Sequence, residues 1–130
     1  MKKVIIAFTI LFILLTFSVI EIIYTNKVYD ELAVVQTKIS DEIDKDEKNI
    51  DTPQAKALSK QCYEYWLKHR AKLMSLCSHM VMLELDKSIV KQQTLININQ
   101  YPDCKVETMT IRNMLTELKK TSLPLLYNLM

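Results

Sequence analysis

Cysteines, histidines and a run of acidic residues are the side chains of this protein that could do chemistry. Cys62 and Cys77 lie 15 positions apart, about 22 Å along one helix, so they cannot form a disulfide with each other unless that helix breaks. Cys104 could reach either of them across a helical bundle. An internal disulfide from Cys104 to Cys62 or Cys77 is therefore one alternative, and buried free thiols are the other.

Metal binding needs ligand spacings that this chain does not offer. Cys62 and His69 lie two helical turns apart, and Cys77 and His79 are neighbours in the sequence rather than one turn apart. Neither pair matches the i, i+4 histidines or the CxxC motif of zinc sites. The acidic stretch 41–51 lacks the glycine that a calcium loop requires. We expect no metal, no cofactor and no catalytic residue, and we predict that the protein is not an enzyme.

The composition points to helices and away from nucleotide chemistry. Glycine is absent from all 130 residues, which excludes the P-loop and the dinucleotide-binding turn, because both need a backbone that can take positive φ and approach the ligand closely. The absence of glycine also disfavours tight β-hairpins, so we predict an all-α protein. The formal net charge is only +2, and nucleic acid is not an expected partner.

An apolar stretch near the N-terminus is long enough to cross a membrane. Val4 to Tyr24 contain one charged residue, Glu21, and would rise about 31 Å as a helix, which matches the hydrocarbon core of a bilayer. Two lysines precede the stretch, so we predict a single-pass protein of the cell membrane with a cytoplasmic N-terminus. Residues 1–24 would be the transmembrane anchor and 25–130 an extracytoplasmic domain. The alternative is a signal peptide cleaved after Ser18.

Beyond the anchor, apolar residues recur at helical spacing. No proline separates the first set from the anchor, so we expect one rod to about residue 48, with an apolar stripe at Val28, Leu32, Val35, Ile39, Ile43 and Ile50. Asp51 and Gln54 can cap a second helix, with a stripe at Ala55, Leu58, Cys62, Tyr65, His69, Leu73, Leu76 and Met80. Trp66 lies beside that stripe and should be buried. The acidic segment 41–51 and the basic segment 56–72 predict an antiparallel hairpin with facing charges.

The rest of the chain continues the helical pattern. Apolar positions recur at Met82, Leu85, Ile89 and Ile96, so this part either extends the second helix or follows a bend between Cys77 and Glu84. Asp103 should cap a last helix with Val106, Ile111, Met114, Leu115 and Leu118. A turn at Ser122 and Pro124 would then start an apolar tail, Leu123–Met130, that docks on the bundle or on a partner.

The predicted fold class is therefore all-α. An N-terminal transmembrane helix would continue into an extracytoplasmic antiparallel helical hairpin or bundle of three to four helices.

The order of these features is similar to that of a known family. A Met-Lys-Lys start, one anchor, an acidic helix, Trp66, His79 at 13 positions beyond it, and a final helix resemble a family of short single-pass membrane proteins from clostridium-like Gram-positive bacteria, catalogued as a domain of unknown function. The resemblance implies a small membrane protein often encoded beside a multi-spanning one, with no assigned activity. Members often carry an acid soon after the histidine, whereas the first acid here is Glu84.

Two functions are compatible with these features. The first is a non-enzymatic, membrane-anchored helical protein that acts as an accessory or assembly factor for an integral membrane protein partner. The second is an extracytoplasmic ligand or ion sensor, with Trp66, His79 and Glu84 lining a small site between helices. The bilayer is an expected partner in both, and homo-oligomerisation is left open.

Overall fold

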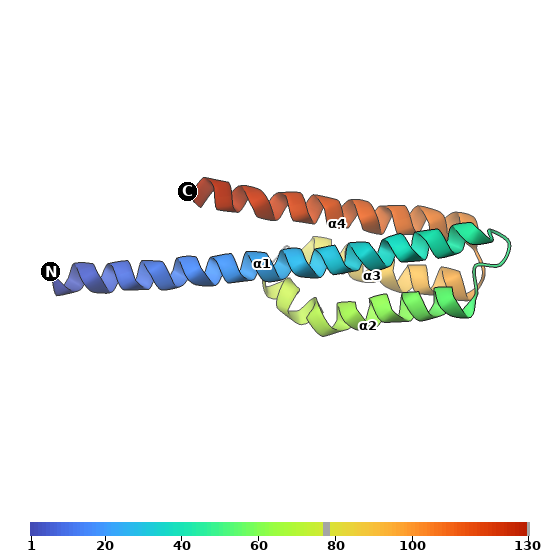
Figure 1. Cartoon of the computed structure of the whole chain (residues 1–130), viewed down its shortest axis with the longest axis horizontal. Coiled ribbons are helices and arrows are strands. Elements are labelled where there is room, and N and C mark those ends of the chain that lie inside the picture. Colours follow the sequence, from blue (N-terminus) through green and yellow to red (C-terminus); the bar gives the residue numbers. More distant parts are fainter. Residues whose placement is uncertain (77–78, 130) are drawn as a thin grey trace.

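Four helices make up the computed structural model of the chain (Figure 1). It describes the backbone of residues 1–76 and 79–129 and the side chains of residues 1–75 and 80–120. The helices are α1 (Lys2–Lys45), α2 (Pro53–Leu76), α3 (His79–Asn97) and α4 (Tyr101–Leu129). The predicted all-α class and the bundle are confirmed, and the helices number four.

Helix α1 is a single rod with two different halves. Its 44 residues contain no proline or glycine and extend about 66 Å, as expected from the uninterrupted pattern. The N-terminal end of α1 extends beyond the other helices (Figure 1) and its apolar side chains are exposed, whereas burial begins at Thr25 and continues to Ile43. One helix therefore connects a free apolar segment to the core of the bundle.

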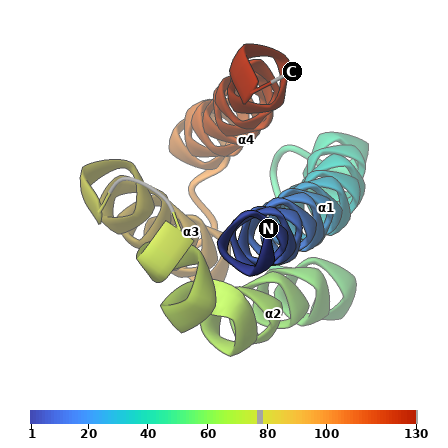
Figure 2. The ribbon, with the colours of Figure 1, turned by 90° about the vertical axis from the view of Figure 1, so that its left-hand side faces the viewer.

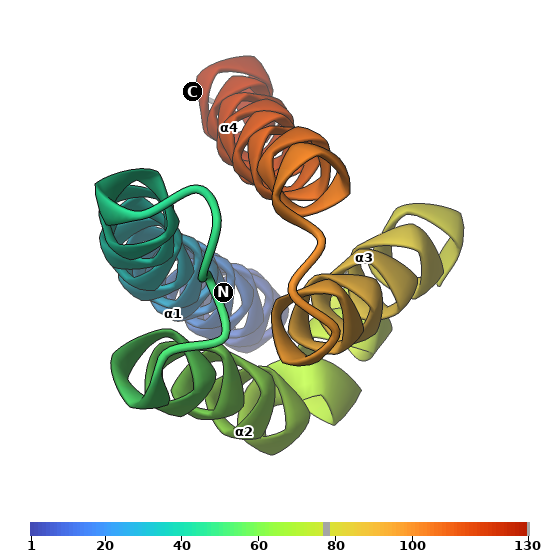
Figure 3. The same cartoon turned by 90° about the vertical axis from the view of Figure 1, so that its right-hand side faces the viewer.

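The helices are arranged as a square, and each packs against two neighbours. α1 and α3 both pack against α2 and α4, while within the described residues the backbones of neither diagonal pair come close to each other (Figure 2). The α1–α2 and α3–α4 connections lie at one end of the bundle (Figure 3). α2 ends, α3 begins and α4 ends toward the side from which α1 extends (Figure 1). We call this side the anchor end and the opposite side the loop end.

The core confirms most of the predicted stripes. All six stripe residues of α1 and its following loop are buried, as are the four of α3, and Trp66 is fully buried. Two expectations are wrong: Met80 is 77% exposed and Val106 is 64% exposed. Met80 belongs to α3 and not to α2, so the apolar spacing of α2 does not predict which way its side chain faces. On α4 the buried face instead passes through Cys104 and Thr108, on either side of Val106.

The helix starts differ slightly from the expected caps. Thr52 Oγ1, rather than Asp51, accepts the hydrogen bond of the Ala55 backbone N–H at 3.1 Å, so Thr52 caps α2. Asp103 lies in the first turn of α4 and not ahead of it, where its charge still suits the positive end of the helix dipole. α4 then continues to Leu129 without restarting at Ser122. The side chains of the predicted tail, Leu123–Met130, lie outside the described residues.

Asn99 joins the two connections at the loop end. Its backbone has φ 58°, a left-handed conformation that asparagine tolerates better than most residues. Its side-chain Oδ1 accepts from the Ile50 N–H and its Nδ2 donates to the Lys48 carbonyl, both at 2.8 Å. The α3–α4 connection is thereby fastened to the α1–α2 connection.

The charges at the loop end pair differently from the prediction. Asp44 of α1 accepts from Lys105 Nζ at 2.6 Å and from Tyr101 Oη at 2.9 Å, and both partners belong to α4. Within the described residues, no ion pair joins α1 to the basic α2. The two helices do form the expected antiparallel hairpin, but apolar packing holds it together, and the acidic end of α1 pairs with α4 instead.

Candidate functional site

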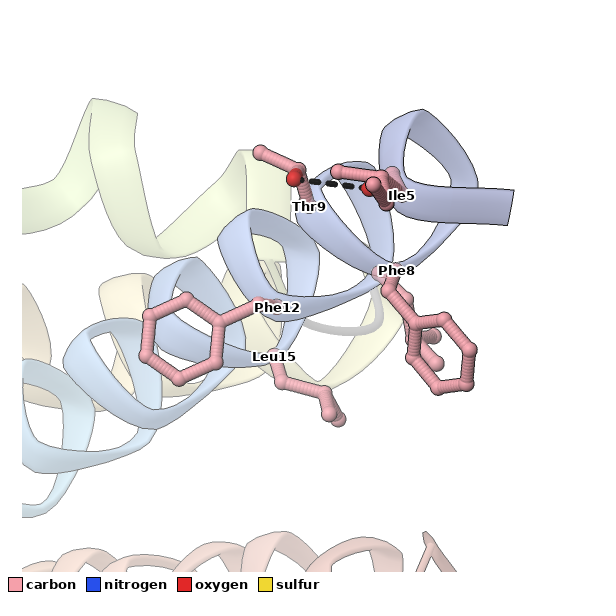
Figure 4. A pocket seen from close by; sticks show the side chains of 6 residues that line it. Ile5, Phe8, Thr9, Phe12 and Leu15 are labelled. Carbon is pink, nitrogen blue, oxygen red and sulfur yellow. Dashed lines mark hydrogen bonds between the residues drawn. The ribbon is translucent and has the colours of Figure 1, made fainter. Parts of the chain in front are cut away.

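Most side chains in the apolar first half of α1 are exposed, and Tyr24 at its end packs against the bundle. α1 is the one described helix long and apolar enough to cross a membrane, and none of its most apolar window is buried. A shallow groove on one face is lined by Ile5, Phe8, Thr9, Leu11, Phe12 and Leu15. The phenyl rings of Phe8 and Phe12 project away from the helix (Figure 4), and Phe12 is 71% exposed. We call this segment, residues 4–24, the apolar span.

The few hydroxyl groups of the apolar span are satisfied within the helix. Thr9 Oγ1 donates to the Ile5 carbonyl at 2.8 Å (Figure 4), and Thr16 and Ser18 make the same bond to the carbonyl four residues earlier, at 2.8 and 3.0 Å. Such bonds remove the polar cost of a hydroxyl in an apolar solvent. The surface of the span is therefore compatible with lipid and with a neighbouring helix.

An aromatic cluster links the end of the apolar span to α2. The Tyr24 hydroxyl hydrogen-bonds to His69 Nδ1, and the two rings lie 5.5 Å apart. The Tyr65 ring lies 4.5 Å from that of His69, and Lys72 Nζ sits 4.2 Å from the Tyr24 ring centroid, in a cation–π contact. We call these four residues the aromatic junction. It ties the last residue of the span to the bundle and gives the rod a defined orientation.

The electrostatics of the aromatic junction keep His69 neutral. Burial holds the pKa of His69 below its ordinary value, and the positive charge of Lys68 acts in the same direction. The pKa of Tyr65 is raised, first by burial and then by its hydrogen bond to Glu31. Both side chains are therefore uncharged at neutral pH, which suits packing at the edge of an apolar segment.

Trp66 and Glu84, two of the three residues singled out by sequence, do not meet. Trp66 Nε1 donates to Asp86 Oδ1 at 2.8 Å, and Arg70 donates to the same oxygen at 3.1 Å. Glu84 is exposed on α3, about 200° around the helix from Asp86. The side chain of His79 lies outside the described residues. The carboxylate that accepts the Trp66 hydrogen bond is thus that of Asp86. Asp86 lies between the buried Leu85 and Ile89 in the sequence, and this position could have indicated it.

A layer of buried polar side chains crosses the middle of the bundle, and sequence analysis missed it. Gln36 and Gln92 exchange two amide hydrogen bonds, of 3.0 and 2.7 Å. Gln92 also donates to Thr108 at 2.8 Å, and Gln36 Nε2 lies 3.2 Å from the Cys62 sulfur. We call these four residues, one from each helix, the polar layer. Each follows or precedes a buried apolar residue at helical spacing, a signal that could have revealed it.

The polar layer is structural rather than a ligand site. Every buried side-chain nitrogen and oxygen in the described residues has a hydrogen-bond partner within the chain, as expected of a layer that holds helices together. Such layers fix the register of helices because any slip leaves polar groups unpaired in the core. The polar layer thus sets how the four helices align.

The cysteines described by the structure are free. Cys62 and Cys104 are both buried thiols, so the alternative of buried free thiols is confirmed for these two, and Cys77 lies outside the described residues. Cys62 and Cys104 belong to α2 and α4, which occupy diagonal corners of the square. Burial raises the pKa of each thiol to about 11, which keeps both protonated and unreactive. Among the described side chains, no three His, Cys, Asp or Glu residues are grouped so as to hold a metal ion.

Taken together, the fold and these contacts define a four-helix bundle with one candidate membrane-spanning helix. No family model matches the chain, and neither curated proteins nor solved structures give a match. The resemblance to the clostridial family therefore stays a prediction.

Proposed function

We propose that this protein is a single-pass membrane protein that acts as a non-enzymatic accessory or assembly factor for an integral membrane protein partner. The observation that carries the proposal is the apolar span, which is exposed over most of its length and yet continuous with the bundle. Cleavage after Ser18 would leave an apolar stub at the start of the bundle. Retention of the whole helix keeps that surface in lipid instead.

The partner is expected to pack on the groove of the apolar span. The lining residues Ile5, Phe8, Phe12 and Leu15 follow a 3-4-3 spacing, which is the seam along which two helices pack. In a bilayer such packing depends on the fit of side chains, since lipid is as apolar as the helices. A second exposed apolar groove runs between α3 and α4, beside Val81, Met114 and Leu118, and offers the partner a contact outside the membrane.

Photo-crosslinking within the apolar span tests this function. A photoreactive amino acid at Phe8 or Phe12, in cells expressing the full chain, should yield a crosslink to an integral membrane protein. The pair Phe8→Ala and Phe12→Ala should abolish co-purification of that protein. Ile10→Ala with Phe17→Ala is the matched control, because these residues lie on the opposite face of the same helix. Crosslinks only between copies of this chain would indicate a homo-oligomer and overturn the proposal.

The orientation in the membrane is tested separately. The two N-terminal lysines predict that the bundle is outside the cell. In a variant with its native cysteines replaced by serine, Lys48→Cys at the exposed loop end should react with a membrane-impermeant thiol reagent applied to intact cells. Lys3→Cys should react only after the membrane is opened. The reverse pattern would contradict the proposed orientation.

A further inference from the structure

Three lysines at the anchor end have no acidic partner. Lys27 of α1 and Lys68 and Lys72 of α2 are exposed, and none forms an ion pair with an acid among the described residues. The nearest acids on α1 are engaged elsewhere: Asp30 binds Lys119 at 2.5 Å, and Glu31 hydrogen-bonds to Tyr65. We call Lys27, Lys68 and Lys72 the lysine cluster.

The aromatic junction lies among the lysines of the cluster. Lys72 Nζ lies 4.2 Å from the Tyr24 ring centroid, Lys27 follows Tyr24 by one turn of α1, and Lys68 precedes His69 on α2. Beyond the effect of burial, all three lysines lower the pKa of His69, whereas the carboxylate of Glu31 raises it. Three positive charges and one negative charge therefore act on His69, and the excess of positive charge can attract an external anion.

The lysine cluster also lies where the apolar span ends. Tyr24 is the last residue of the span, and Lys27 follows it by three positions, about 4.5 Å along the helix. Tyrosines at such a boundary typically sit at the level of lipid headgroups, and Tyr24 and Tyr65 flank the lysines here. At the loop end, the connection after α1 carries Asp46, Glu47 and Asp51. The cluster lies at the end of the bundle nearest the membrane surface, where Glu21, Asp30 and Glu31 are the acids of α1 beside it.

We propose that the lysine cluster binds the phosphate of anionic phospholipids, such as phosphatidylglycerol, at the surface of the membrane that α1 crosses. The inference rests on the membrane span of the proposed function but not on its protein partner. Ammonium groups bind phosphate by charge-assisted hydrogen bonds, and the phenol rings of the aromatic junction pack beside the glycerol region. The anionic lipid would thereby hold the bundle against the bilayer at a set height and rotation.

Native mass spectrometry of the full chain in a non-ionic detergent tests the inference. Titration with dioleoyl phosphatidylglycerol should give preferential binding over dioleoyl phosphatidylcholine, and added salt should weaken it. Each lysine near an anionic surface contributes about fivefold in affinity (about 1 kcal/mol). The triple variant Lys27→Gln, Lys68→Gln, Lys72→Gln should therefore lose up to about 100-fold. All three side chains are exposed, and unchanged Trp66 fluorescence will show that the fold is intact.

A matched variant separates this site from net charge alone. Lys48→Gln, Lys56→Gln and Lys60→Gln remove the same three charges from exposed positions toward the loop end, and this variant should bind phosphatidylglycerol like the unaltered chain. Equal binding of both lipids, retention of the preference in the first triple variant, or equal loss in both variants would overturn the inference. Failure of the chain to float with vesicles of either lipid would instead refute the membrane span. If the chain binds phosphatidylglycerol but a photoreactive amino acid at Phe8 gives no crosslink to a membrane protein, the protein partner alone is refuted.

Discussion

Replacing Gln92 with leucine should weaken the bundle by removing the centre of the polar layer. Gln92 is buried and makes three hydrogen bonds with Gln36 and Thr108. In Gln92→Leu, Gln36 Oε1 loses its donor at 2.7 Å, and Gln36 Nε2 keeps only the weak contact with Cys62. An unpaired buried polar group costs about 1–3 kcal/mol, so the free energy of unfolding should fall by about 2–4 kcal/mol. That is a large part of the roughly 5–15 kcal/mol typical of a domain.

Removing both glutamines should cost less than removing one. In the double variant Gln36→Leu, Gln92→Leu no amide is left unpaired, and Thr108 still donates to the Cys104 carbonyl at 2.8 Å. Replacing both partners of a buried hydrogen bond with apolar groups of similar shape is often close to neutral. The double variant should therefore be more stable than Gln92→Leu alone, and the cycle of four proteins should give a strong coupling between the two positions.

Denaturant unfolding of the full chain in micelles measures this effect. Trp66 is the only tryptophan and is fully buried, so its fluorescence reports the folded bundle without a label. The reasoning is refuted if Gln92→Leu unfolds at the same denaturant concentration as the unaltered chain. It is also refuted if the double variant loses the sum of the two single losses, since the amides would then act independently.

Three further changes test other contacts of the bundle. Trp66→Phe removes the indole donor to Asp86 while keeping a ring in the core, so a thermal melt should show a loss of about 1 kcal/mol, against about 3–5 kcal/mol for Trp66→Ala. An unchanged melt of Trp66→Phe would contradict a stabilising hydrogen bond. Asn99→Ala and Asn99→Gly both remove the side-chain bonds at the loop end, but only alanine is strained at φ 58°, so alanine should be less stable by about 1 kcal/mol in chemical unfolding. The hydrogen bond from Lys105 holds the pKa of Asp44 below its ordinary value, so this pair stabilises the fold above about pH 4 and its contribution is lost as the pH falls through the lowered pKa. Lys105→Met should flatten that acid limb in a plot of stability against pH, and an unchanged slope would refute the pairing.

The helices and most of their buried faces were predictable because apolar periodicity is a local property. A rod without proline or glycine and stripes at spacings of three and four need no knowledge of the partner helices. The expectation for Met80 was wrong because the phase of a stripe is lost where one helix ends and another begins. Trp66 was correctly expected in the core, yet its partner Asp86 was not identified, because the facing residue depends on how two helices are rotated toward each other.

The helical spacing of the polar-layer residues could indicate that they are buried, but which residues pair in the layer and in the ion pairs depends on the arrangement of four helices. Glutamine is usually a surface residue, and Gln36 and Gln92 can be buried because their side-chain amides hydrogen-bond to each other. Asp44 pairs with Lys105 on α4 rather than with a residue of the basic α2. This choice could not be predicted without knowing that α1 packs against both α2 and α4. Lys68 and Lys72 belong to the basic segment that the sequence indicates, but the position of Lys72 over Tyr24 at the end of the apolar span depends on the fold.

The members of the polar layer also become available at different times during synthesis of the chain. They extend from Gln36 to Thr108, 72 positions apart, which take roughly 4–14 s to add at typical rates of translation. Gln92, the counterpart of the first amide, is added 56 positions after Gln36, and until then the bundle has no complete core. A nascent chain that stalls before Thr108 would lack the hydrogen bond from Gln92 to Thr108 and most of α4, and would expose an apolar face of the bundle to quality-control proteases. Packing of α4 against α1 and α3 is thus the step that completes the core of a full-length chain.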